Sequence, residues 1–222
     1  MHPILVAGTG SYRDDARVDW YCPLSPFARF LASQSLAPAF HHWRSTPDLA
    51  QQAPFIWSTD LAGLPWTRTS TWAAGGTALA YFIEVTADLR GKETAILAHS
   101  HALQVVLYAC AEQGILVNQL ISVGSPVRKD MQAIAARARP RINHWLHIHS
   151  DRSDHWQWFG ELFDGHFGIV REHPLADRND AVPGVGHSEL LRDPLCQSHW
   201  LDRGWLMPLR DPLPIVFPEP PG

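Results

Sequence analysis

The chain has 222 residues, 45% of them hydrophobic, which is enough to bury a substantial core within one globular domain. Its 18 basic and 22 acidic side chains give a net charge of −4 with no basic stripe, which argues against nucleic acid as the main partner. No apolar run approaches the roughly 20 residues of a membrane span, and the opening Met1-His2-Pro3 lacks the charged start of a leader.

Strand-like and helix-like patterns alternate along the chain. Short apolar runs predict strands at residues 4–7, 54–58, 94–98, 120–123, 145–149 and 167–170. Helical spacing and capping residues predict helices at residues 26–36, 73–89, 101–113 and 130–137. The first helix follows Ser25, an N-cap residue, and opens on Pro26, as helices often do. This alternation is typical of an α/β fold on a parallel sheet.

One stretch combines a buried strand, a polar corner and a helix. Residues 94–98 are apolar, Ser100 stands at the corner, and the helix that follows ends at Gly114, a residue suited to a left-handed C-cap. A serine held between a strand and a helix presents its hydroxyl outward. The backbone N–H behind it lies at a helix N-terminus, where it can stabilise a developing oxyanion.

The corner, Ala98-His99-Ser100-His101-Ala102, resembles the nucleophile elbow G-x-S-x-G of the α/β-hydrolases, with alanine at both glycine positions. Strand and helix crowd at this turn, so alanine, the next smallest residue, permits the turn with more strain. The Gly-Ser-Pro turn at residues 124–126 resembles the corresponding turn of lipase-like members. The resemblance implies a three-layer α/β-hydrolase fold, in which a mostly parallel sheet carries helices on both faces, in a minimal version lacking the family's first strands.

The same resemblance implies catalytic roles in the chain order serine, acid, histidine. Ser100 is then the nucleophile. The acid belongs in the loop after the strand at residues 145–149, where Asp154 is preferred and Asp151 is the alternative. His187, in a glycine-containing loop near the carboxyl end, is the expected base.

The oxyanion would be bound by two backbone N–H groups, those of His101 and of Thr9 in the Ala-Gly-Thr-Gly turn at residues 7–10. The imidazoles of His99 and His101 are expected to be packing or pocket residues, because neighbours at an elbow point away from the nucleophile.

These assignments predict an esterase- or lipase-like enzyme that forms an acyl-enzyme on Ser100 and requires no metal or organic cofactor. Its substrate would be a small-molecule or lipid ester. Several tryptophans are expected in loops or at strand ends, where they line either a pocket for an apolar or aromatic group or the core: Trp57, Trp66, Trp72, Trp156 and Trp158.

Two other functions fit parts of the sequence. His147, His149 and Asp151, with the pair at residues 154–155, resemble the H-x-H-x-D-H metal ligands of the metallo-β-lactamase fold, since alternate strand residues share a face. Two extra residues interrupt that pattern, and the strand–helix order differs from the antiparallel sheet of that fold. The alanines of the elbow favour the second alternative, a catalytically silent α/β-hydrolase-fold binding protein.

Cys22, Cys110 and Cys196 are widely spaced and lack zinc-like pairing, which predicts free thiols in a reducing compartment. We therefore expect a cytoplasmic protein with a single domain over residues 1–222, in which the Pro-rich residues 212–222 form an extended tail. The sequence favours no particular oligomeric state.

Overall fold

The computed structural model describes residues 3–6, 8, 20, 25–36, 39–40, 69–85, 94–151, 154, 155, 157 and 171–210. In this part of the chain a six-stranded sheet runs in the order β2-β1-β3-β4-β5-β6. Its strands are β1 (Pro3–Val6), β2 (Ala39–Phe40), β3 (Ala95–His99), β4 (Val117–Val123), β5 (Ile142–Ser150) and β6 (Arg178–Val182). Every neighbouring pair is parallel, as the alternating pattern predicted.

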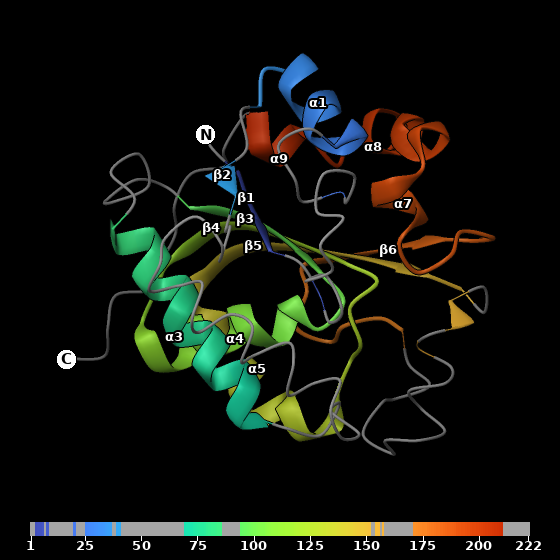
Figure 1. The fold of residues 1–222 in the computed structure, drawn as a ribbon. Coiled ribbons are helices and arrows are strands. Elements are labelled where there is room, and N and C mark those ends of the chain that lie inside the picture. The colour runs from blue at the N-terminus through green and yellow to red at the C-terminus, as the bar shows by residue number, and fades with distance from the viewer. Residues whose placement is uncertain are drawn as a thin grey trace.

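Helices cover both faces of this sheet (Figure 1). The helices on one face are α3 (Thr69–Val85), α4 (Ala102–Gln113) and α5 (Gln132–Ala138). Those on the other face are α1 (Pro26–Ser33), α7 (Glu189–Arg192), α8 (Gln197–Asp202) and α9 (Met207–Arg210). Single 3₁₀ turns lie at Lys129–Met131, Arg139–Arg141 and Pro194–Cys196. The predicted three-layer α/β architecture is therefore confirmed.

The sheet separates two hydrophobic clusters, and β3 contributes residues to both of them. Its residues Ile96 and Ala98 join the cluster under α3 and α4, whereas Ala95 and Leu97 join the cluster under α1 and α8. A strand buried on both faces needs a continuous apolar run, which is why residues 94–98 could be recognised from sequence. No helix of the described ranges is long and apolar enough to cross a membrane.

Several element boundaries differ from prediction. The first helix ends at Ser33 rather than Leu36, although Ser25 caps it as expected by accepting from the Ala28 N–H at 3.0 Å. The second predicted helix begins at Thr69, which corrects the placement of Trp72 in a loop: this tryptophan lies in the first turn of α3 and is fully buried.

Strand β6 was not predicted, because its sequence Arg-Asn-Asp-Ala-Val carries mostly polar residues. It pairs with β5 at the edge of the described sheet, where polar side chains are tolerated. The strands predicted at residues 54–58 and 167–170 and the tail at 212–222 lie outside the described residues.

Candidate active site

The strand order reverses between β1 and β3, because β2 lies on one side of β1 and β3 on the other. In open α/β sheets, ligands bind beyond the carboxyl ends of the strands at such a switch point. Gly8 lies two residues after β1, and Ser100 directly follows β3. A Cβ on Gly8 would lie 2.6 Å from the Ser100 Cβ and 2.7 Å from the His99 carbonyl oxygen, so only glycine fits there.

Ser100 has a left-handed backbone with φ of +56°, which is costly for a residue with a Cβ. Its N–H donates to the Val123 carbonyl at the end of β4 at 3.0 Å, and α4 begins two residues later. The flanking Ala98 and Ala102 are completely buried, which accounts for the small side chains at both positions. Ser100 thus occupies the strained strand-to-helix turn that the sequence predicted.

His187 and Asp154 are in contact, with Nδ1 of the imidazole 2.7 Å from Oδ2 of the carboxylate. The Asp154 side chain is 1% exposed and the His187 side chain 14% exposed. An ionised carboxylate can only accept, so in the neutral imidazole of His187 the proton lies on Nδ1 and the lone pair on Nε2. That tautomer lets Nε2 act as a proton acceptor.

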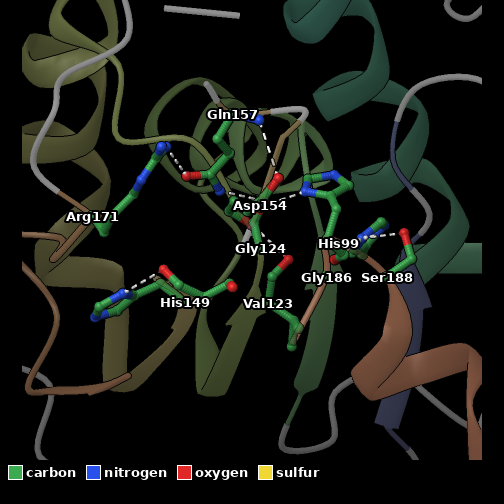
Figure 2. Close-up of polar contacts among 12 residues, drawn as sticks. His99, Val123, Gly124, His149, Asp154, Gln157, Arg171, Gly186 and Ser188 are labelled. Atoms are coloured by element: carbon green, nitrogen blue, oxygen red, sulfur yellow. Dashed lines mark hydrogen bonds and ion pairs between the residues drawn. The ribbon is translucent and has the colours of Figure 1, made fainter. Parts of the chain in front are cut away.

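Asp154 is held by Gln157, as Figure 2 shows. The Gln157 N–H donates to Asp154 Oδ1 at 3.1 Å, and the Gln157 side-chain amide donates to the Gly124 carbonyl at 2.8 Å. Arg171 in turn donates to Gln157 Oε1 at 2.5 Å. These contacts connect Asp154 to the end of β4.

Ser100 and His187 lie against consecutive residues at the end of β4. The Ser100 N–H is bonded to Val123, and the next residue, Gly124, is so close to His187 that a Cβ there would lie 2.9 Å from the His187 carbonyl oxygen. The described residues show no hydrogen bond between the Ser100 hydroxyl and His187.

Only one of the two predicted oxyanion donors lies within the described residues. His101 stands at the N-cap position of α4 with φ of −65° and ψ of −7°, which puts its N–H at a helix N-terminus. Thr9 lies outside the described residues.

The His101 ring stacks on Trp72 with centroids 5.6 Å apart, and the Arg128 guanidinium lies 4.7 Å from the Trp72 ring centroid. Burial and the nearby Arg128 lower the pKa of His101 to about 3, so this imidazole is neutral.

Asp151, the alternative acid, makes a different contact: its Oδ1 accepts from the Gly184 N–H at 3.3 Å. Gly184 belongs to the loop that carries His187, so Asp151 contacts that loop at its beginning. The carboxylate in contact with the imidazole is that of Asp154.

The arrangement does not fit the metal-ligand alternative. His147 is fully buried and bonded at both ring nitrogens: Nε2 donates to the Arg171 carbonyl at 2.9 Å, and Nδ1 accepts from the Ser122 hydroxyl at 2.8 Å. Burial and the neighbouring His173 lower the pKa of His147 to about 3. Within the described ranges no group of three His, Cys, Asp or Glu side chains is arranged to hold a metal ion.

A cavity of about 670 Å³ opens beside His187, and Ser100 is not among its described lining residues. Its described lining is His155, Gly184, Gly186, His187, Ser188, Glu189, Arg192 and Asp193. Of the tryptophans considered for a pocket, Trp72 lies under the elbow rather than in this lining, and the other four fall outside the described residues.

Sequence reasoning missed Gln157, although a local signal was present. Asp154 and Gln157 have the N-cap and N3 spacing of a capping box, in which the cap side chain accepts from the N3 backbone N–H. The contact of Gly8 with Ser100 joins residues far apart in the chain and left no comparable local pattern.

Comparisons with known proteins show similarity in fold. No protein-family model and no curated protein matches the chain. A predicted CIB-like hydrolase from Thermoplasma acidophilum aligns with a TM-score of 0.50 at 12% identity, over 95% of this chain and 86% of that one. An uncharacterized protein from Bacillus cereus aligns with a TM-score of 0.51 at 15% identity, over 90% of this chain and 59% of that one. At these identities the similarity shows the fold alone, an α/β fold shared with a hydrolase-like structure.

Proposed function

We propose that this chain is a single-domain serine hydrolase that cleaves carboxylic esters. Ser100 is the nucleophile, His187 the general base and Asp154 the acid that orients it. The observation that carries the proposal is the 2.7 Å contact of His187 with the buried Asp154, at the same sheet edge as the left-handed Ser100. The tautomer that this contact imposes leaves the His187 Nε2 ready to accept the serine proton.

The proposed reaction begins with attack of the Ser100 hydroxyl oxygen on the ester carbonyl carbon, while its proton passes to His187. Asp154 stabilises the imidazolium, and the N–H groups of His101 and Thr9 donate to the oxyanion. The imidazolium then protonates the leaving alcohol as its bond to carbon breaks. A water, deprotonated by His187, then attacks the acyl carbon. As the bond from that carbon to the Ser100 oxygen breaks, the imidazolium returns the proton to Ser100 and the carboxylic acid is released.

The cavity beside His187 supports a small-molecule ester as the substrate. Its volume of about 670 Å³ falls within the range of small-molecule pockets, roughly 300 to 1,000 Å³. A series of p-nitrophenyl esters of increasing acyl length tests this, because turnover should fall once the acyl group exceeds the cavity.

The direct test of the proposed function is labelling with a fluorophosphonate. The folded protein is expected to gain one covalent adduct, which peptide mass mapping assigns to Ser100, whereas heat-unfolded protein stays unlabelled. Adduct on Ser188, the serine that lines the cavity, or no adduct on the folded chain would contradict the nucleophile assignment.

Gly124→Ala is expected to lower esterase activity beyond its effect on stability. Both Gly124, with φ of +56°, and Gly204, with φ of +68°, are left-handed, so alanine costs about 1–2 kcal/mol at either position. Only at Gly124 would the new Cβ meet the His187 carbonyl oxygen; at Gly204 it would meet only the Met207 Cγ, at an ordinary 3.7 Å. Since a displacement of about 1 Å can cost 10²-fold in rate, kcat of Gly124→Ala should fall at least about tenfold.

Gly204→Ala is the matched control for this variant, because Gly204 is not among the described lining residues of the cavity. It should unfold at a similarly reduced urea midpoint while retaining its kcat. Equal kcat values in the two variants would show that the close approach of Gly124 to His187 does not affect catalysis.

A further inference from the structure

His99, which directly precedes the serine, is buried against the loop of the proposed base. It is the last residue of β3 and faces the same side of the sheet as Ala95 and Leu97, the side on which α7 lies. Its side chain therefore lies beneath the loop that carries His187 into α7. Only 5% of His99 is exposed.

His99 contacts both the backbone and the ring of His187. Its Nε2 lies 3.1 Å from the His187 carbonyl oxygen and 3.2 Å from the Ser188 hydroxyl, the latter drawn in Figure 2. The two imidazoles have centroids 4.8 Å apart at an angle of 55°. Trp20 packs against His99 at 5.8 Å in an edge-to-face arrangement.

The hydrogen bonds fix the protonation of His99. A backbone carbonyl can only accept, so Nε2 carries the proton and donates to His187. Burial and the adjacent His187 hold the pKa of His99 well below its usual value, so the ring stays neutral. The Nδ1 lone pair is then buried without a hydrogen-bond partner in the described residues, which costs free energy of folding. Packing of the ring alone does not explain why a histidine occupies this position.

Other contacts hold the preceding loop residues but not His187 itself. Asp151 accepts from the Gly184 N–H, the Ser150 hydroxyl donates to the Val185 carbonyl, and Glu189 accepts from the Gly186 N–H. Asp154 holds the ring of His187, and His99 holds its backbone. Ring and backbone are thus fixed by separate elements.

We propose that His99 is a positioning residue, whose Nε2–H holds the His187 carbonyl and so aims the imidazole at Ser100. The consequence for catalysis rests on the proposed function. The hydrogen bond itself does not, and it can be measured in a protein without esterase activity.

The test compares His99→Phe with His99→Gln. Phenylalanine keeps the ring packing and loses the donor, whereas the glutamine amide nitrogen reaches approximately the position of Nε2. His99→Phe should lose about 10–100-fold in kcat with KM unchanged, because misplacement by about 1 Å can cost 10²-fold. His99→Gln should recover most of that loss. His99→Leu, smaller and also without a donor, replaces the phenylalanine variant if that variant does not fold.

Amide hydrogen exchange of residues 185–188 supplies a readout besides activity. Exchange should be faster in His99→Phe than in wild type and close to wild type in His99→Gln. His173→Phe is the control, because His173 is equally buried at 6% exposure but packs on Trp145, away from His187. It should change neither kcat nor exchange in this loop.

The outcomes separate the two proposals. Faster exchange in His99→Phe with no turnover in wild type would keep the positioning contact and remove the proposed function. Unchanged exchange and kcat in His99→Phe, or equal losses in the phenylalanine and glutamine variants, would overturn the role of His99.

Discussion

Ser100→Ala is expected to abolish ester hydrolysis while leaving the fold unchanged. The substitution removes only the hydroxyl oxygen and keeps the Cβ that packs against Gly8. Removing the serine of such a triad lowers kcat by on the order of 10⁶-fold, because the residual rate comes only from the oxyanion donors and substrate binding. Initial rates with p-nitrophenyl acetate measure the loss, and far-UV circular dichroism with a thermal melt monitors the fold.

Ser100→Gly is the informative companion variant. Glycine also lacks the hydroxyl, but it adopts the φ of +56° at this position without the Cβ penalty. We expect Ser100→Gly to be as inactive as Ser100→Ala and at least as stable. Retained turnover in either variant would remove Ser100 from the mechanism, whatever the melting temperatures.

The elbow could be predicted from sequence because its information is local. The strand Ala95–His99 is buried on both faces and needs an uninterrupted apolar run, and α4 ends at Gly114 in the predicted left-handed conformation with φ of +75°. A parallel sheet follows from such units placed in sequence. The α/β fold class could therefore be predicted from the hydrophobic pattern and the helix-capping residues alone.

Strand β6 shows where local patterns fail. Arg178, Asn179 and Asp180 have low strand propensity, but β6 pairs with β5 over its whole length, and Asp180 accepts from Arg178 and from the Trp205 indole. Strand β5 and Trp205 belong to other elements, so the sequence of this segment alone does not reveal them. The pairing rather than the composition makes this segment a strand, and it is β6 that leads into the loop of His187.

The beginning of α3 shows the same limit. Its first residues, Thr-Ser-Thr at 69–71, are β-branched or polar and favour a loop on propensity. Trp72 is nevertheless fully buried against the His101 ring, and this packing across elements supports the first helical turn. The sequence placed this tryptophan in a loop, lining either a pocket or the core; it lies in a helix and packs against the residue that follows Ser100.

Asp154→Asn tests which carboxylate orients His187, because the sequence left Asp151 as an alternative to Asp154. The asparagine side chain can present an N–H to His187 in place of an acceptor, which favours the tautomer with the proton on Nε2 and the lone pair on Nδ1. The imidazole then has no free nitrogen facing the serine. The loss in kcat should be on the order of 10⁴-fold, with KM nearly unchanged, because the geometry remains while the proton acceptor is lost.

Asp151→Asn is the matched control, since it makes the same chemical change three residues earlier in a carboxylate that bonds to the Gly184 N–H and not to the imidazole. An asparagine oxygen can still accept from that N–H, so its kcat should stay within about threefold of wild type. The ratio of the two rates is the decisive quantity, because both carboxylates contact the loop of His187 but only Asp154 contacts its imidazole. A large loss in Asp151→Asn together with a small one in Asp154→Asn would transfer the role of the acid to Asp151.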